Sequence, residues 1–464
     1  MSVEEKLTTL HLEVLERIRP KKAERERLTN EFKKIEQQIN EILKKSKIEG
    51  EIELSGSFSR DSWLSGNRDI DIFVKMPYDS TVTPQQLIKV LRDGIDLPWQ
   101  KKHAHHPYLF TEKDDFEIEI IPCYQIKKGM KLRSAVDRSP LHKAFINQNM
   151  PVGSTDDVRL LKQFMRGIGS YGAEIKVHGF SGYLVELLTI HFGGKFIDVL
   201  KQAKTLPGKV ITFAPDLEID LSKYEGEPII VIDPTDDNRN VASSVRIEAL
   251  NTFIAAAENY LRNPKLEYFF PKKIIVDKEK LQQMKENPIK LTAIIHKRKA
   301  KIVSDVLWGQ LRRFERGLVT YLANCDFGPI KVDSLIDGEN IVTAIISMEN
   351  IAPEYYWHTG PPIDHEAQLT FIEKYRNNNQ VVYGPDISEG RWRVLLQQDQ
   401  ATIKEIIEKG IKENSIAIPS HIQVNERNNT ILPKKELLEK YANNKELLAY
   451  FYQLILGTSC LVAD

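Results

Sequence analysis

Two short runs of alternating acidic and aliphatic residues constrain the fold of this 464-residue chain more than any other feature. The first is residues 69–74, Asp-Ile-Asp-Ile-Phe-Val, and the second is residues 116–121, Phe-Glu-Ile-Glu-Ile-Ile. Side chains alternate between the two faces of a strand, so each run predicts a strand with one aliphatic face and one acidic face. Pro122 follows the second run and is expected to end it. The chain therefore requires a sheet with one covered face and one polar face.

The segments around these runs predict a small mixed α/β unit. Residues 3–47 carry Leu and Ile at helical spacing, interrupted at Pro20. Residues 48–54 alternate, and residues 84–92 are again helical. The βα elements are too few for a doubly wound sheet, so a compact α+β arrangement is expected.

The remainder of the chain predicts further domains. Helical periodicity returns in two segments beyond residue 150, followed by a strand, a polar turn from Asp233 to Asn240 and a helix through Tyr260. Beyond Pro264 helices and strands alternate without a glycine-rich phosphate loop. The segments are helices at 156–166, 181–192 and 434–456, and strands at 228–232, 341–347 and 380–383.

Charge and cysteine content exclude several classes of protein. The chain has 65 basic and 65 acidic residues, so a polyanionic partner must be held by local basic patches. No apolar run is long enough for a membrane span, and the N-terminus lacks the pattern of a signal peptide. Cys123, Cys325 and Cys460 form no C-x-x-C pair, which indicates neither a disulfide framework nor a zinc site. A reducing cytoplasm is the expected location.

The acidic residues of the two alternating runs suggest a metal site. Asp69 and Asp71 lie on one face of their strand, about 6.6 Å apart. Carboxylates so placed can bridge two Mg²⁺ ions, which clamp the attacking and leaving oxygens in phosphoryl transfer. Glu119 is chosen over Glu117 as the third ligand. An acidic alternating strand alone is more often an ordinary half-buried strand, so the assignment depends on the surrounding motifs.

A glycine-serine turn upstream supplies such a motif. Glycine lets the backbone approach an anion closely, so the N–H groups at Gly56 and Ser57 and the Ser57 hydroxyl can hold phosphates. Arg60 adds positive charge. The turn, the acidic pair and the second acidic strand are parts of one mechanism, and together they favour a metal site for phosphoryl transfer.

These motifs resemble the signature of the DNA polymerase β-like nucleotidyltransferase superfamily. Later segments narrow the resemblance to the archaeal (class I) CCA-adding enzymes, which are tRNA nucleotidyltransferases. The segments that carry the narrower resemblance include Arg159-Leu160-Leu161-Lys162, Gly179-Phe180-Ser181-Gly182-Tyr183, Arg239-Asn240-Val241-Ala242 and Gly390-Arg391-Trp392.

The resemblance implies a multidomain α+β fold and an activity. It implies template-independent addition of CCA to the tRNA 3′ end from CTP and ATP, with two Mg²⁺ ions bound by Asp69, Asp71 and Glu119. A homodimer is left open. The implied domains are a catalytic head at 1–145 with a small mixed sheet, a helical neck at 146–260 that completes the nucleotide pocket, an RNA-binding α/β body at 261–380 and an RNA-binding tail at 381–464.

The resemblance also implies roles for individual residues. Gly56, Ser57 and Arg60 would flank the triphosphate, and Arg239 would read the base. Glu119 stands where the group commonly has Asp, and Ser139 where Thr is usual. Positions that match phosphate and sugar contacts are His142, Lys162 and Tyr171 on the nucleotide and His106 and Ser139 on the RNA.

The chemistry of Arg239 and of a basic run also suggests functions for them. Arginine only donates, which suits the acceptors cytosine N3 and adenine N1 and disfavours uracil and guanine. In a polar turn, however, an arginine is more often a solvated loop residue. The densest basic segment is a candidate for tRNA phosphates, although charge runs are usually solvated faces. Its residues include Lys297, Arg298, Lys299, Arg312 and Arg313.

Two alternatives remain open from the sequence. A poly(A) polymerase or oligoadenylate synthase would share the glycine-serine turn and the acidic pair, and only the segments after residue 155 argue against it. A non-catalytic RNA-binding scaffold would be expected to have lost a metal carboxylate, and all three positions are acidic. Product length separates the first alternative from CCA addition.

Overall fold

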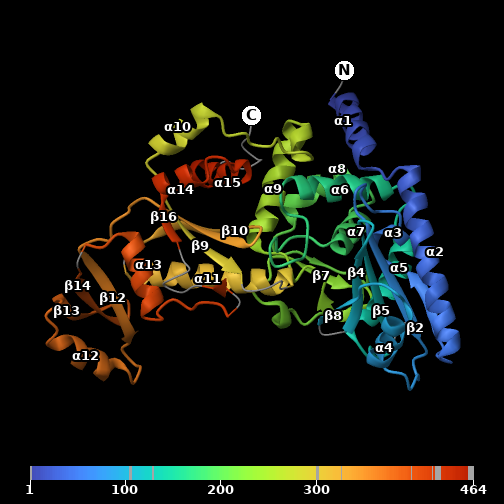
Figure 1. Ribbon diagram of the computed structural model, residues 1–464, viewed down its shortest axis with the longest axis horizontal. Helices are drawn as coiled ribbons and strands as arrows, with labels where there is room; N and C mark the ends of the chain where they lie inside the picture. Colours follow the sequence, from blue (N-terminus) through green and yellow to red (C-terminus); the bar gives the residue numbers. More distant parts are fainter. Residues whose placement is uncertain are drawn as a thin grey trace. The chain divides into compact units, whose positions relative to one another are not determined.

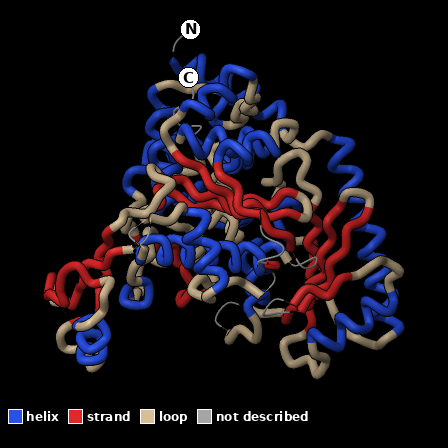
Figure 2. The backbone as a smooth tube through the Cα atoms, turned by 60° about the vertical axis from the view of Figure 1, so that its left-hand side comes forward, coloured by secondary structure: helices blue, strands red, loops and turns tan. Residues whose placement is uncertain are grey.

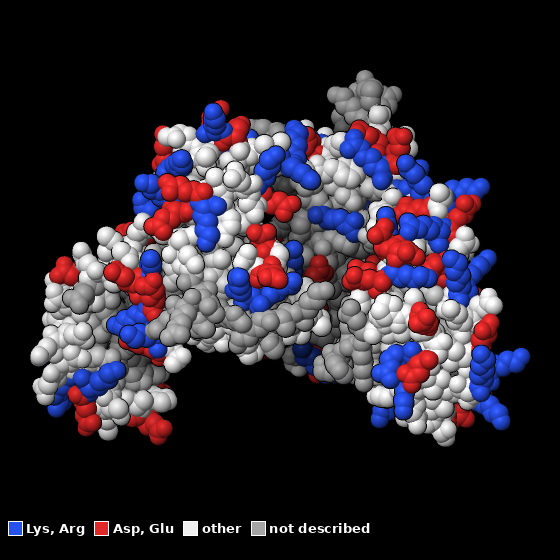
Figure 3. Space-filling model, viewed as in Figure 1, with Lys and Arg blue, Asp and Glu red and all other residues white. Residues whose placement is uncertain are grey.

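The computed structural model divides the chain into two compact units, residues 1–272 and 273–464 (Figure 1). It describes residues 3–103, 107–127, 130–298, 303–325, 327–398, 400–420, 422–423 and 430–457. Within these residues, no helix has the length and apolar character needed to cross a membrane. Figure 2 shows each sheet as a group of adjacent strands. On the face seen in Figure 3, basic and acidic side chains are interspersed, in keeping with the zero net charge.

The first unit contains a five-stranded sheet in the order β1-β2-β5-β4-β3. β2 and β5 run parallel at its centre, and the other neighbouring strands are antiparallel. The acidic runs predicted as strands are therefore adjacent. The strands are β1 (Glu51–Leu54), β2 (Asp69–Met76), β3 (Gln100–His103), β4 (Pro107–Lys113) and β5 (Phe116–Tyr124).

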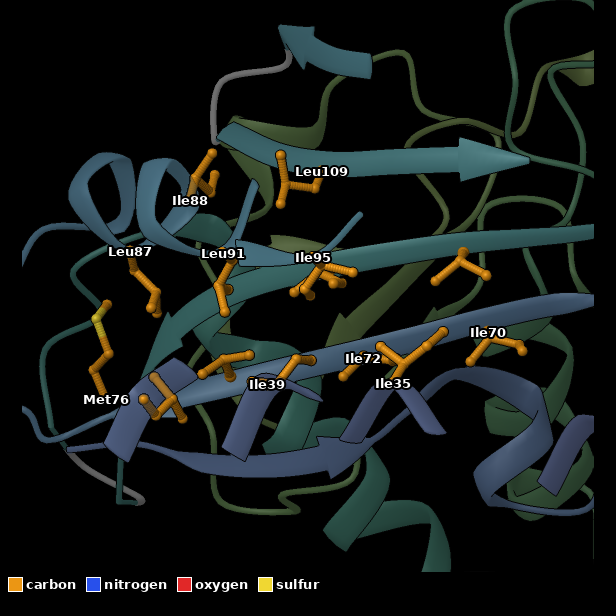
Figure 4. Close-up of a cluster of buried hydrophobic side chains, with 14 of the residues drawn as sticks. Ile35, Ile39, Ile70, Ile72, Met76, Leu87, Ile88, Leu91, Ile95 and Leu109 are labelled. Atoms are coloured by element: carbon orange, nitrogen blue, oxygen red, sulfur yellow. The ribbon is translucent and has the colours of Figure 1, made fainter. Parts of the chain in front are cut away.

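One face of this sheet is covered by two helices, α2 (Lys22–Lys45) and α4 (Pro84–Gly94). Ile70 and Ile72 of β2 are fully buried, and aliphatic side chains of both helices belong to the same hydrophobic cluster (Figure 4). α4 begins with a capping box in which Thr83 and Gln86 bond each other's backbone N–H groups. The alternation in the sequence thus predicts correctly which face is covered.

The structure corrects the expected end of the second acidic strand. β5 continues through Pro122 to Tyr124 in parallel register with β2. In the described residues, β5 pairs with β4 only from Phe116 to Ile120. Pro122 lies beyond this pairing, so the N–H that proline lacks is not required for a hydrogen bond to β4. β3, β4 and the helix α5 (Arg138–Asn149) were not predicted from the sequence either.

Helices dominate the rest of the first unit, and their core is aromatic. Phe164, Phe196 and Tyr260 pack edge to face, with ring centroids 5.4–5.9 Å apart. The polar turn expected from Asp233 to Asn240 is instead a hairpin that includes a strand. The elements are α1 (Val3–Ile18), α3 (Gly56–Ser59), α6 (Thr155–Gly167), α7 (Gly182–His191), α8 (Phe196–Gln202), α9 (Ile247–Arg262), β6 (Val210–Ile211), β7 (Ile230–Asp233), β8 (Asp236–Asn240) and the 3₁₀ turns η1 (Ala135–Asp137), η2 (Ala203–Thr205), η3 (Leu221–Tyr224) and η4 (Leu266–Tyr268).

The second unit is rich in strands. Its larger sheet has the order β10-β11-β9-β15, with β16 also paired to β9, and is covered by α11 on one face and by α14 and α15 on the other. A three-stranded sheet, β12-β14-β13, packs on α12. Residues 434–456, predicted as one helix, form two, and Asn444 caps the second. The elements are β9 (Lys290–Arg298), β10 (Pro329–Asp337), β11 (Asn340–Ser347), β12 (Tyr355–Pro362), β13 (Val381–Ser388), β14 (Arg391–Gln397), β15 (Ile422–Gln423), β16 (Thr430–Pro433), α10 (Lys278–Glu286), α11 (Ser304–Asn324), α12 (Gln368–Arg376), α13 (Ile403–Lys412), α14 (Lys434–Lys440) and α15 (Lys445–Leu456).

Candidate active site

The acidic residues of β2 and β5 are brought together by the parallel register. Asp71 pairs with Glu119 and Asp69 with Glu117 across the two strands. Residues between them in each strand, such as Ile70 and Ile118, point to the buried side. All four acidic residues therefore belong to the polar face, and Glu119 is the one aligned with Asp71.

The two aspartates share an acidic environment, in which Asp71 is half-buried and Asp69, at the start of β2, is exposed. Burial, together with the negative charge of Asp69, raises the pKa of Asp71 to about 6, and the positive charge of Arg60 opposes both effects. Burial also raises the pKa of Asp69, against the charge of Arg166. In the described part of the chain neither aspartate forms an ion pair, so a bound cation would stabilise both carboxylates.

The glycine-serine turn lies directly against Asp71. Gly56 has a φ of +66°, which favours glycine, and opens the short helix α3. A Cβ atom at position 56 would come closer than 3.0 Å to Oδ2 of Asp71. The backbone N–H of Ser55 also donates to the Asp71 carbonyl oxygen at 2.9 Å. Only a residue without a side chain fits between the turn and the carboxylate.

The donors at this site suit a hard cation such as Mg²⁺, which prefers carboxylate oxygens. Asp69 and Asp71 supply them from one strand, and Gly56 leaves the space beside them open. Among the described residues, no group of three or more His, Cys, Asp or Glu side chains is already assembled to hold a metal ion. The register therefore aligns the predicted metal ligands Asp71 and Glu119, but their side chains do not form a finished three-ligand group among the described residues.

A buried ionic cluster lies near this face and includes two of the predicted nucleotide-binding residues. Oε2 of Glu186 on α7 accepts from Nε of Arg60 at 2.9 Å, and its Oε1 accepts from Nζ of Lys162 at 3.1 Å. The hydroxyl of Ser62 also donates to Oε1 of Glu186. Nothing in the sequence marked Glu186 except that it is a lone acid in an apolar helix.

Tyr171 lies beside this cluster. Burial, together with the negative charge of Glu186, raises the pKa of Tyr171 to about 12. Its hydroxyl lies 3.0 Å from the position that a Cβ atom of Gly182 would take, so α7 approaches the tyrosine closely where it begins. The guanidinium of Arg166 lies 5.6 Å from the centre of the Tyr171 ring.

A second cluster is centred on Asp233, at the end of β7. Its Oδ2 accepts from Nε2 of His142 at 2.8 Å and from Nη1 of Arg239 at 2.6 Å. The His142 ring stacks on Tyr183 with centroids 4.0 Å apart. Burial would raise the pKa of Asp233, but the hydrogen bond and charge of His142 and the hydrogen bond of Arg239 hold it well below its usual range. Sequence reasoning gave His142 and Arg239 roles in nucleotide binding but gave no role to the Asp233 carboxylate between them.

The remaining predicted residues are dispersed. Ser139 is half-buried on α5, whereas His106 and Lys299 lie outside the described residues. Lys297 and Arg298 end β9 in the second unit. Arg313 is exposed on α11. Its neighbour Arg312 pairs with Glu315 at 2.9 Å and Asp333 at 3.2 Å, which partly neutralises its charge.

Three family models match separate parts of the chain. Residues 156–270 match "tRNA nucleotidyltransferase, second domain", and residues 290–432 match "CCA-adding enzyme, C-terminal domain". Residues 1–135 match the "Second Messenger Oligonucleotide or Dinucleotide Synthetase domain".

Relatives from archaea match nearly the whole chain. A protein of Pyrobaculum aerophilum named "CCA-adding enzyme" is 34% identical over 395 residues, which cover 84% of this chain and 90% of that protein. A protein of the same name from Methanosarcina barkeri is 34% identical over 430 residues, 90% of this chain and 92% of its own length.

Solved structures resemble part of the chain more distantly. The Cid1 poly(U) polymerase with Mg 3′-dATP bound has a TM-score of 0.45 at 14% identity, over 57% of this chain and 96% of that one. Escherichia coli MS115-1 CdnC with ATP has a TM-score of 0.42 at 16% identity, over 56% of this chain and 94% of that one.

Proposed function

Because this chain belongs to the family of CCA-adding enzymes, we propose that it adds C, C and A to the 3′ end of tRNA without a nucleic-acid template, from CTP and ATP. The observation that supports the chemistry is the acidic face of β2 and β5, with Gly56 held against Asp71. In the reaction, the terminal 3′-OH oxygen bonds to the α-phosphorus of the nucleotide, and pyrophosphate leaves.

Each residue of the site has a proposed task. Two Mg²⁺ ions, when bound, supply the charge that stabilises the attacking and leaving oxygens. Asp69 and Asp71 would hold both ions, and Glu119 would complete the set beside the 3′-OH. Ser57 and Arg60 would bind the triphosphate, and Lys162 would pair with Glu186 beside Arg60.

The other groups of the first unit orient the substrates. Tyr171 and His142 would contact the sugar and phosphates of the nucleotide, and Arg239 would contact its base. Ser139 and His106 would contact the end of the RNA. Asp233 supports this proposal because it holds His142 and Arg239 on one oxygen atom. Three further expectations stay predictions. They are a homodimer, a cytoplasmic location, and the division into a head at 1–145, a neck at 146–260, a body at 261–380 and a tail at 381–464.

The experiment that tests the function uses a tRNA that lacks its terminal CCA. The purified protein is incubated with this tRNA, Mg²⁺ and each labelled nucleoside triphosphate, singly and as CTP with ATP. We expect extension by three nucleotides ending in A, followed by a stop. A long homopolymer would assign the chain to the poly(A) polymerases instead, and binding of tRNA without extension would make it a scaffold.

The choice between the two acids of β5 can be tested by substitution. Glu119→Gln is expected to reduce nucleotide addition as strongly as loss of an aspartate of β2, because Glu119 is aligned with Asp71. Glu119→Asp should be tolerated, since it keeps the charge. Glu117→Gln is the matched control on the same strand and face. If Glu117→Gln were the inactive variant and Glu119→Gln the active one, the assignment of the third metal ligand would be wrong.

Base selection is expected to depend on Arg239. Arg239→Ala should lower incorporation of CTP and ATP together and reduce their advantage over UTP and GTP. The reason is that the arginine donor favours cytosine and adenine and opposes uracil and guanine, and the variant lacks it. Each effect corresponds to about 1–3 kcal/mol. The measurement is incorporation of each nucleotide separately on a tRNA that ends before the first C. An equal loss of rate for all four would mean that Arg239 does not select the base.

The basic end of β9 is proposed to contact tRNA phosphates. Lys297→Gln with Arg298→Gln is expected to weaken tRNA binding and to reduce the slope of log affinity against log salt by ~0.7–0.9 per lost contact. Exchange of two exposed lysines of α13, Lys404 and Lys412, for glutamine is the control. An unchanged slope in the β9 variant would show that these side chains form only a solvated face.

A further inference from the structure

The carboxylate of Glu186 connects two segments that are far apart in the sequence. Arg60 follows the glycine-serine turn, Lys162 lies on α6, and Glu186 lies on α7. Lys162 and Glu186 are buried, with exposed fractions of 1% and 0%, and the side chain of Arg60 is 10% exposed. A carboxylate buried this deeply keeps its charge only when it is paired and fully hydrogen-bonded.

Lys162 and Arg60 differ in how many of their hydrogen-bond donors are used. The ammonium group of Lys162 has three donors, and it contacts the Ser62 carbonyl at 3.0 Å, the Ser62 hydroxyl at 3.0 Å and Glu186 at 3.1 Å. Its donors are therefore all in use. Arg60 uses Nε on Glu186, and within the described residues its two terminal NH₂ groups have no hydrogen-bond partner.

The charges of the cluster do not balance. Lys162 and Glu186 neutralise each other, so the charge of Arg60 is left over in a site from which water is largely excluded. The same charge acts on Asp71, whose pKa it lowers against the effects of burial and Asp69. An excess positive charge held near the acidic face is an arrangement that favours a polyphosphate anion.

We propose that Glu186 is a positioning residue for the triphosphate: it fixes the guanidinium of Arg60 through Nε, so that the two terminal NH₂ groups point to the phosphates. Lys162 serves as the counter-ion that keeps Glu186 charged. This proposal rests on the proposed function for the identity of the triphosphate as CTP or ATP. Glu186 does not touch the nucleotide, and it acts entirely through Arg60.

A double-mutant cycle between Arg60 and Glu186 tests the proposal. Glu186→Gln and Arg60→Ala are each expected to raise KM for CTP and ATP at least about tenfold, with a smaller change in kcat. The double variant should have the KM of Arg60→Ala alone, because Glu186 has no effect without the guanidinium. Glu248→Gln, at an exposed position in the first turn of α9, is the matched control and should leave KM unchanged.

The loss of a buried charge can also destabilise the fold, so a second variant separates the two effects. Lys162→Met with Glu186→Gln removes both buried charges and leaves no unpaired ion. If this variant melts like the wild type and the addition of Arg60→Ala to it raises KM no further, positioning of Arg60 by Glu186 is supported. Multiplicative effects of Arg60→Ala and Glu186→Gln, or an unchanged KM in a folded Glu186 variant, would overturn the proposal.

Equilibrium binding of CTP, measured on the same proteins without tRNA, gives an independent readout of the coupling. If the effects of Arg60→Ala and Glu186→Gln on CTP binding are coupled but the wild type does not extend tRNA, the proposed function fails and the positioning role stands. If the wild type extends tRNA but the two effects are independent, the proposed function stands and the positioning role fails.

Discussion

Replacement of Asp71 by asparagine is expected to reduce nucleotide addition by about a thousandfold or more and to change tRNA affinity less than about twofold. Asparagine keeps the shape of the side chain but removes the charge that would hold both metal ions. The phosphates of tRNA are bound by basic side chains, so RNA affinity does not depend on this carboxylate. Single-turnover addition and a tRNA titration on the same preparation measure the two quantities.

Asp69→Asn should behave in the same way, because Asp69 shares the polar face of β2. Asp96→Asn, at an exposed position after α4, is the control for general loss of negative charge in the first unit. Near-normal addition by the Asp71 variant would contradict the assignment of this pair to the metal ions.

Gly56→Ala is expected to reduce nucleotide addition by about a hundredfold or more, although only one methyl group is added. The new Cβ atom would come closer than 3.0 Å to Oδ2 of Asp71, so either the carboxylate or the turn must move. The residue also has a φ of +66°, at which a side chain adds backbone strain. The measurement is the rate of addition at saturating CTP, together with thermal unfolding.

Gly66→Ala separates the clash from the strain. Gly66 has a φ of +85°, but a Cβ atom there would meet nothing within 4 Å. This control should lose a similar amount of stability, about 1 kcal/mol, and keep its activity. Equal losses of activity in the two variants would mean that close approach to Asp71 is not what position 56 requires.

The acidic face could be predicted from the sequence because it depends on local alternation. A strand with Ile70 and Ile72 on one side must place Asp69 and Asp71 on the other, whatever strand lies next to it. The preference for Glu119 depends on register, and the structure aligns Glu119 with Asp71. The family motifs supplied the activity, which the alternation alone did not.

The supporting carboxylates could not be predicted, because their partners come from distant parts of the chain. Glu186 meets Arg60 across 126 residues, and Asp233 meets His142 across 91. An acid in an apolar helix and an acid before a proline carry no local signal of such contacts. The end of β5 was predicted wrongly at Pro122 for a related reason. A proline ends a strand only where a neighbouring strand would need its N–H, and the sequence does not show where that neighbour lies.

The parallel pairing of β2 with β5 affects the order in which the first unit can fold. Parallel neighbours cannot be joined by a tight turn, and here the connection contains α4, β3 and β4. The pairing of Asp71 with Glu119 across the two strands therefore forms only after a long loop closes, which makes it a slow, non-local step. Repulsion between like charges opposes that step, and burial of the isoleucines behind the carboxylates drives it. A mutation that weakens this aliphatic face should delay the appearance of activity during refolding, even where the final amount of active enzyme is unchanged.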